Sequence, residues 1–186
     1  MIGTGDIKKG LNIVIDGKLY LIKDWQHTKV AQGLGKITMK LRDLREGRTI
    51  EYHCVAGAKF EKATLERNTA QYLYHDGDFY YVMDAKTFEQ TPLTKDQLGD
   101  AVNYLKENMN LDILTYKDEV VSVELPNFVE LEVIEADPGF RGDTAANVTK
   151  PGKLETGLTI PIPLFVNQGD VIRVDTRTGQ YMERVS

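Results

Sequence analysis

The chain has 186 residues, of which 41% are hydrophobic and 27% charged, and its formal net charge is −5. This length suits one ordinary domain or two or three small ones. No apolar run approaches membrane-spanning length and the opening residues lack an apolar signal core, so we expect neither a membrane protein nor an exported one. The single cysteine, Cys54, excludes an internal disulfide, as is usual in the reducing cytoplasm.

The charge is distributed unevenly along the chain. Residues 1–63 hold 12 basic and 7 acidic side chains, a net charge of +5, whereas residues 64–126 hold 5 and 12, a net charge of −7. Residues 127–186 hold 6 and 9, a net charge of −3. The basic first third suits contact with a nucleic-acid backbone, which the acidic middle would repel. The alternative is that Lys and Arg only solvate an exposed sheet.

The first third has the pattern of a small β-barrel. Asp16-Gly17 and Glu46-Gly47 are turn signals between strand-like runs. Residues 30–35 read VAQGLG, and two glycines within three residues favour a projecting loop over a packed one. The expected strands are Asn12–Ile15, Lys18–Lys23, Ile37–Leu44 and Thr49–Val55.

The middle third repeats this pattern and adds one helix signal. Residues 75–78 (HDGD) predict another hairpin turn. Thr94 and Gln97 have the spacing of a capping box, and apolar residues recur on one face up to residue 105, so we predict a helix over Thr94–Asn108. Five strands and a short helix suit an OB-type barrel. The expected strands include Gln71–Tyr74, Phe79–Asp84, Leu111–Tyr116 and Val120–Leu125.

Tyrosines are concentrated in this acidic middle third. An OB barrel can stack bases on tyrosine, but the negative charge argues against that use. We therefore expect these tyrosines to fill a small core from half-buried strands. They are Tyr72, Tyr74, Tyr80, Tyr81, Tyr104 and Tyr116.

The last third again shows about five short strands between turn-rich segments, including Val129–Ile134 and Leu158–Val166. Pro126-Asn127 marks a boundary before it. We predict an all-β, elongated protein of three small β-barrel domains in tandem. Residues 1–63 form an SH3-like or KOW-type barrel, and residues 64–126 and 127–186 form two OB-fold barrels.

No arrangement of residues indicates an enzyme. The sequence has no nucleotide-binding glycine motif, no HExxH, no cysteine pair for zinc and no nucleophile elbow. His27, His53 and His75 are scattered, and His53 and its neighbour Cys54 should point to opposite faces of a strand. We therefore expect no covalent chemistry, no metal and no cofactor.

Several separate strings resemble one family of proteins. They are DIKKGLNIVIDGKLY in the first third, AQYLYHDGDFYYVMD and QLGDAVNYLKENM in the middle, and PGFRGDTAANVTKPGKLETG, PIPLFVNQGD and VDTRTGQY in the last third. In this order, and over essentially the whole chain, they resemble bacterial elongation factor P, a translation factor. Gly152 stands where that family usually has alanine.

The resemblance implies a task and its partners. Such factors bind both subunits and the RNA of the ribosome between the peptidyl and exit sites, beside the P-site peptidyl-tRNA, and their shape mimics a tRNA. They relieve stalling at consecutive prolines, and the ribosome does the chemistry while the factor positions the peptidyl-tRNA. A cytoplasmic monomer that needs no membrane is implied.

The resemblance also assigns a loop of the first domain to the CCA end of the tRNA. The loop residues are Lys29, Val30, Ala31, Gln32, Gly33, Leu34, Gly35 and Lys36. The family's tip carries a lysine or arginine that is often enzymatically extended, whereas this tip carries Gln32, which cannot take a lysine modification. Three explanations stay open: an unmodified Gln32 hydrogen-bonds RNA, Lys29 or Lys36 supplies the charge, or the chain has an altered tip or is a weakened paralogue.

Two further sites follow from the resemblance. The segment Arg141, Gly142, Asp143 and Thr144 matches a loop that faces the small subunit near the exit-site codon, and its alternative is a tight turn. Tyr181 and Arg184 match an ending that lies against the peptidyl-tRNA stem, and their alternative is a surface pair at a strand end. Arg177 is expected to brace a hairpin.

A different function is the alternative for the whole chain. It is a tandem OB-type RNA-binding protein or chaperone that acts off the ribosome. That protein would need exposed aromatic residues on a basic barrel face, whereas the aromatic residues concentrate in the acidic middle.

Overall fold

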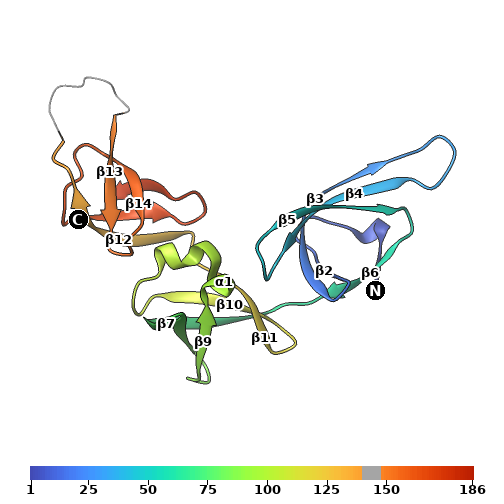
Figure 1. Cartoon of the computed structure of the whole chain (residues 1–186), viewed down its shortest axis with the longest axis horizontal. Helices are drawn as coiled ribbons and strands as arrows, with labels where there is room; N and C mark the ends of the chain where they lie inside the picture. Colours follow the sequence, from blue (N-terminus) through green and yellow to red (C-terminus); the bar gives the residue numbers. More distant parts are fainter. Residues whose placement is uncertain (140–147) are drawn as a thin grey trace. The chain divides into compact units, whose positions relative to one another are not determined.

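The computed structural model describes residues 1–139 and 148–186, so the predicted site Arg141–Thr144 lies outside the described residues. Those two ranges fold mostly as β-strands with short helical segments, which confirms the all-β prediction. Contacts divide the chain into two compact units (Figure 1). Unit 1 comprises Met1–Asn68 and Ile113–Ser122, and unit 2 comprises Thr69–Asp112 and Val123–Ser186. The division into three domains stays a prediction.

Unit 1 contains a six-stranded antiparallel sheet with the strand order β1-β6-β2-β3-β4-β5. Asp16 and Gly17 have φ angles of 50° and 75°, the left-handed pair that a tight two-residue hairpin requires, so this predicted turn is confirmed. The elements are β1 (Ile2–Gly3), η1 (Thr4–Asp6), β2 (Asn12–Ile15), β3 (Lys18–Thr28), β4 (Lys36–Asp43), β5 (Thr49–Val55) and β6 (Lys59–Ala63).

The strand β3 is five residues longer than the sequence pattern indicates. Its second half, residues 24–28, is mostly polar and lacks a clean alternation. It is a strand because β4 pairs with it, from Asp24↔Lys40 to Thr28↔Lys36, beyond a bulge near Lys23. Pairing across a hairpin therefore decides the structure of a segment that has little strand signal of its own.

The core of unit 1 comes from the inward faces of these strands. Each fully buried Ile, Leu or Met contributes about 1.5–3 kcal/mol relative to an exposed side chain. The end of the hairpin formed by β10 (Asn110–Tyr116) and β11 (Glu119–Glu124) belongs to the same unit, where Val121 packs against Leu19 and Ala63. The main buried cluster is Ile7, Ile13, Tyr20, Ile22, Ile37, Met39, Leu41 and Phe60.

The second sheet has the order β11-β10-β7-β8-β9. Tyr72, Val82 and Leu93 are buried on its inner side. The prediction that all six tyrosines of this part fill a core was wrong for Tyr74 and Tyr81. A β-bulge after Tyr72 places Tyr74 beside Tyr81 on the outer face, where Tyr74 is 45% exposed and Tyr81 is half-buried. Its strands are β7 (Glu66–Asp76), β8 (Phe79–Asp84), β9 (Gln90–Thr94), β10 (Asn110–Tyr116) and β11 (Glu119–Glu124).

The helix expected over Thr94–Asn108 is present only at its start. Thr94 caps α1 (Lys95–Leu98) as predicted, with its hydroxyl accepting the Gln97 N–H at 3.4 Å and Gln97 Oε1 accepting the Thr94 N–H at 2.9 Å. Gly99 then adopts φ 56° and ψ −133°, a conformation open mainly to glycine, and the α-helix ends there. The chain continues as the 3-10 helix η2 (Gly99–Tyr104).

The third sheet has the order β14-β13-β12-β15-β16 and a core of its own. Tyr104 of η2 is 7% exposed and belongs to this core, together with Leu131 and Ile160. The Thr156 hydroxyl donates to the Asn103 carbonyl at 2.6 Å, which also ties η2 to this sheet. The strands are β12 (Phe128–Ala136), β13 (Thr149–Leu154), β14 (Thr159–Pro163), β15 (Val171–Asp175) and β16 (Gln180–Arg184).

Candidate nucleic-acid interface

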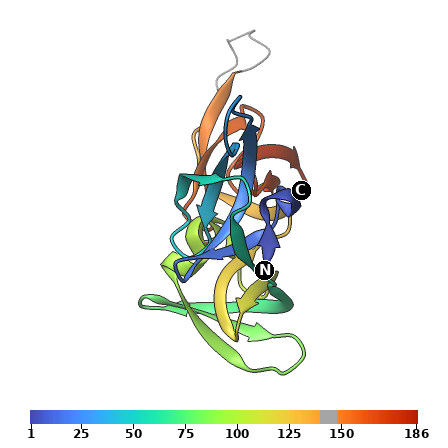
Figure 2. The same ribbon diagram turned by 90° about the vertical axis from the view of Figure 1, so that its right-hand side faces the viewer.

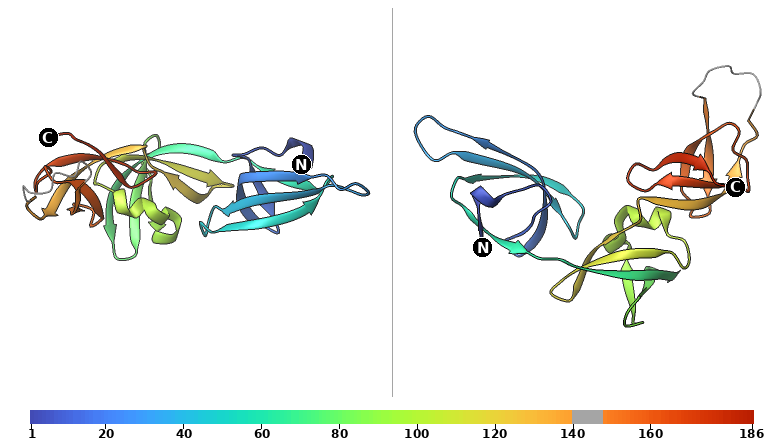
Figure 3. Two further views of the ribbon diagram at one scale, coloured as in Figure 1. Left: turned by 90° about the horizontal axis from the view of Figure 1, so that it is seen from above. Right: turned by 180° about the vertical axis from the view of Figure 1, so that it is seen from behind.

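The predicted loop lies at the end of the β3–β4 hairpin. Figures 1 and 3 show β3 and β4 side by side and leading into it. Residues 29–34 and Lys36 are exposed, and Gly35 is half-buried. Val30 and Leu34 are 53% and 72% exposed, so the fold gives neither apolar side chain a core to pack in. Exposed apolar residues beside lysines suit contact with a partner better than they suit solvation.

The end of this loop at Gly35 is hydrogen-bonded to the neighbouring chain segment at Ala56. The Gly35 carbonyl accepts the Ala56 N–H at 2.7 Å. A Cβ on Gly35 would collide with the His27 ring, an exposed side chain that would have to move, and would press on the Thr28 carbonyl, so this position favours glycine. Within the described residues, no hydrogen bond or ion pair engages the side chain of Lys29, Gln32 or Lys36.

The strand β4 supplies a basic outer surface below the loop. Its residues alternate, so that Ile37, Met39 and Leu41 are buried while Lys36, Lys40 and Arg42 are exposed. Exposed residues two apart on a strand lie roughly 7 Å from one another. The hairpin that carries the loop therefore presents part of the positive charge of the first third on its surface.

His53 and Cys54 lie on the neighbouring strand β5, and both have structural contacts there. Cys54 packs against the core, and burial raises the pKa of its thiol, which opposes a reactive thiolate. His53 points the other way, as predicted from strand geometry: its Nδ1 lies 3.0 Å from the Thr38 hydroxyl and its Nε2 lies 3.2 Å from a carboxylate oxygen of Glu51. Both contacts of His53 are therefore made to neighbouring residues of the same sheet.

In unit 2, Tyr181 and Arg184 both lie on β16. Tyr181 is half-buried and packs against the core of the third sheet opposite Val174. The Arg184 guanidinium lies 5.5 Å from the centre of the Phe165 ring and 3.5 Å from Asp170 Oδ2. Both side chains therefore have partners in their own barrel while keeping part of their surface exposed.

Arg177 braces the β15–β16 hairpin, as predicted. Its Nε and Nη2 donate to the two carboxylate oxygens of Asp175 at 3.0 and 2.8 Å. The side-chain hydrogen bond from Arg177 is the main cause of a lowered pKa at Asp175, which is only 6% exposed. The Arg177 guanidinium also lies 5.5 Å from the centre of the Phe128 ring.

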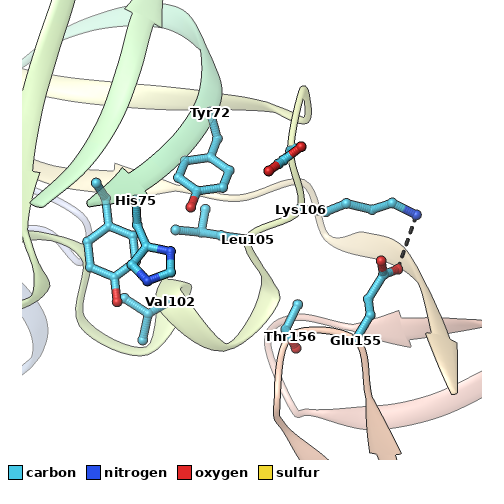
Figure 4. Close-up of a pocket in the computed structure, with 9 residues that line it drawn as sticks. Tyr72, His75, Val102, Leu105, Lys106, Glu155 and Thr156 are labelled. Atoms are coloured by element: carbon cyan, nitrogen blue, oxygen red, sulfur yellow. Dashed lines mark ion pairs between the residues drawn. The ribbon is translucent and has the colours of Figure 1, made fainter. Parts of the chain in front are cut away.

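Unit 2 also has a pocket that the sequence did not indicate (Figure 4). Its volume is about 620 Å³, and an ion pair of 3.1 Å between Lys106 and Glu155 lies at its edge. Its residues come from β7, β8, the η2 region and the β13–β14 turn, so no local motif could have revealed it. The lining is Tyr72, His75, Tyr80, Val102, Leu105, Lys106, Glu107, Glu155 and Thr156.

Among residues 1–139 and 148–186, no cluster of three or more His, Cys, Asp or Glu side chains could hold a metal ion. Across the same ranges, no helix has the length and apolarity that crossing a membrane requires.

Comparison with known proteins identifies the family. A model of the KOW-like domain of elongation factor P matches residues 3–60, one of its OB domain matches residues 65–123, and one of its C-terminal domain matches residues 129–184. Elongation factor P of Carboxydothermus hydrogenoformans is 52% identical over 185 residues, and that of Acetivibrio thermocellus is 50% identical; both matches cover 100% of this chain and 100% of the relative. The chain belongs to the elongation factor P family. It is therefore a translation elongation factor, and the resemblance drawn from the sequence is confirmed.

A solved structure agrees on the fold of this elongation factor P family member. Translation initiation factor 5A from Methanococcus jannaschii has a TM-score of 0.55 at 22% identity, over 66% of this chain and 92% of that one. The KOW-like and OB domain models likewise agree with the predicted barrel types. Among the site residues, the loop belongs to unit 1, whereas Tyr181 and Arg184 belong to unit 2.

Proposed function

We propose that this elongation factor binds the ribosome between the peptidyl and exit sites, contacts peptidyl-tRNA and relieves stalling at consecutive prolines. One observation carries the proposal: the loop from Lys29 to Lys36 lies mostly exposed at the end of a basic hairpin, and no hydrogen bond or ion pair within the described residues engages its lysines or Gln32. Membership of the elongation factor P family supplies the context of translation.

In this proposal the loop approaches the CCA end of the P-site tRNA. Lys29 and Lys36, on either side of the tip, neutralise phosphate, and the Gln32 amide both donates and accepts hydrogen bonds at the tip. The hold on Gly35 fixes the direction of the loop, which lowers the entropy lost on binding. No modification of Gln32 is required.

The reaction itself belongs to the ribosome. A proline nitrogen is a secondary amine within a ring, and the ring restricts the backbone geometry around it. A factor that holds the peptidyl-tRNA end in a reactive pose lowers the barrier by reducing the entropy lost on reaching the transition state. This chain therefore acts through positioning as a cytoplasmic monomer without a cofactor, and it is not an enzyme in its own right.

The other sites complete the contact with the ribosome. Tyr181 and Arg184 lie against the peptidyl-tRNA stem, where the exposed part of the guanidinium pairs with phosphate. The segment Arg141–Thr144 contacts the small subunit near the exit-site codon. Three domains, residues 1–63, 64–126 and 127–186, distribute these contacts along the factor.

The test is translation of a reporter with three consecutive prolines in a purified system that lacks this factor. Unmodified recombinant wild type should relieve the stall, and Gln32→Ala should relieve it less. If only protein purified from its own host is active, a modification is needed and the unmodified mechanism is wrong. If no preparation relieves the stall or binds ribosomes, the proposed function is wrong although the fold stands.

A further inference from the structure

The outer face of the β7–β8–β9 strands is unusually apolar. Figure 2 shows these three strands and their two turns in green. On β8 the residues alternate, so Val82 is buried inside while Phe79, Tyr81 and Met83 lie on the outer face. Cross-strand pairing places Tyr74 and Pro92 beside Tyr81. We call the set Tyr74, Phe79, Tyr81, Met83 and Pro92 the aromatic face.

Three residues of the aromatic face are exposed, and Tyr81 and Met83 are half-buried. Tyr74 and Phe79 are 45% and 46% exposed, and Pro92 is also exposed. The Tyr74 and Tyr81 rings stack with centroids 4.9 Å apart, which presents one broad aromatic surface. The solvent side of an antiparallel sheet is normally polar, and contiguous exposed apolar surface marks an interaction site.

The surroundings of this face are acidic. Residues 66–96, which contain all three strands, hold six acidic side chains and three basic ones. Asp76 pairs directly with Phe79 across the hairpin, and Asp78 lies in the adjoining turn. An aromatic surface with an acidic rim complements Lys and Arg, which stack on tyrosine rings and pair with carboxylates. Nucleic acid would meet repulsion here because its backbone is negative.

We propose that the aromatic face docks on a positively charged protein surface, with Lys or Arg side chains over the Tyr74–Tyr81 pair. The inference rests on the proposed function in one respect: it takes the partner to be a basic protein of the ribosome. It adds a protein contact in the acidic middle third to a factor whose loop at residues 29–36 and whose strand β16 are both proposed to contact tRNA.

The first test measures the affinity of purified ribosomes for matched variants of the full chain. Tyr74→Ser with Tyr81→Ser should raise the Kd at least about tenfold, because aromatic anchors dominate interface energetics. Tyr74→Phe with Tyr81→Phe keeps the rings and should stay within about threefold of the wild type. Phe88→Ser removes an aromatic residue that is 70% exposed in the β8–β9 turn outside this face, and it should leave the Kd unchanged.

The second test identifies what the face touches. A photoreactive p-benzoylphenylalanine in place of Tyr81 should crosslink to a ribosomal protein in a product that resists ribonuclease, and the same probe at Phe88 should not. Crosslinks to RNA, or within the chain itself, would overturn the proposal. So would an unchanged Kd for the double serine variant when the wild type binds. A wild type that does not bind ribosomes at all would instead contradict the proposed function on which this inference rests.

Discussion

The loop at residues 29–36 and the end of β16 are both candidate contacts for tRNA, yet the fold treats them differently. Arg184 stacks on Phe165 and faces Asp170, and Tyr181 packs on a core. In the loop, Val30 and Leu34 are exposed, and no partner within the described residues engages the Gln32 side chain. Residues that the fold already uses can resemble a family for structural reasons alone, so the loop is the stronger pointer to function.

This comparison can be tested by asking whether a substitution in each region changes stability or activity. The largest change in stability is expected at Tyr104, which is buried in the core of the third sheet. Tyr104→Ala should destabilise unit 2 by about 3–5 kcal/mol because it leaves a large cavity. Tyr104→Phe keeps the ring and should cost far less. Chemical denaturation followed by circular dichroism measures the stability of both variants. An equal loss of unfolding free energy in the two would show that the Tyr104 ring does not anchor η2 to the third sheet.

Gly152 should come next, since the fold leaves no room for a side chain there. A Cβ at this position would collide with the Ile162 side chain on β14. Gly152→Ala should destabilise by about 1–3 kcal/mol through overpacking. Adding Ile162→Val should recover part of that loss, whereas simple additivity in a double-mutant cycle would contradict the proposed clash.

The Asp175–Arg177 brace should give a pH-dependent effect. Arg177 holds the pKa of Asp175 below its usual value, so this carboxylate stabilises the fold above the unfolded pKa of about 3.9 and loses that contribution as the pH falls through its lower folded pKa. Asp175→Asn should lower the melting temperature at pH 7 and reduce its decline between pH 5 and 3. An unchanged pH profile in thermal melts would rule out the brace as a source of stability.

The smallest change in stability is expected in the loop. Lys29→Ala with Lys36→Ala should shift the free energy of unfolding by less than about 0.5 kcal/mol, because both side chains are exposed. Ribosome binding should nevertheless weaken, and the slope of log affinity against log salt should fall by about 0.7 to 0.9 for each lysine that contacts phosphate. If the double variant lost stability and kept the salt slope of the wild type, the two lysines would serve the fold and not the contact with tRNA, which would contradict the comparison made above.

Much of the fold could be predicted from local patterns. Asn12–Ile15, Thr49–Val55 and Phe79–Asp84 were predicted with their observed bounds because alternation and turn residues mark them. The extension of β3 was not, since it depends on pairing with β4. The α-helix was predicted too long because apolar periodicity continues past Gly99, which ends it.

The candidate sites likewise include residues that could be predicted from the sequence and residues that could not. The order of the motifs and their resemblance to a family indicated the loop. The alternation of side chains along a strand correctly placed Cys54 and His53 on opposite faces. The aromatic face was missed because a bulge after Tyr72 moves Tyr74 to the outer side, and a bulge leaves no clear signal in sequence. The burial of Tyr104 in the third core was missed because it depends on contacts distant in sequence.

The central claim is that the loop meets the end of the P-site tRNA, and a single crosslinking measurement tests it most directly. p-Benzoylphenylalanine at Gln32 would be compared with the same probe at Lys62, an exposed residue of β6 in the same unit, on purified ribosomes stalled at consecutive prolines. The account predicts a crosslink from position 32 to the 3′ end of the peptidyl-tRNA and none from position 62. Bound factor that gives no tRNA crosslink from position 32, or equal crosslinks from both positions, would contradict it.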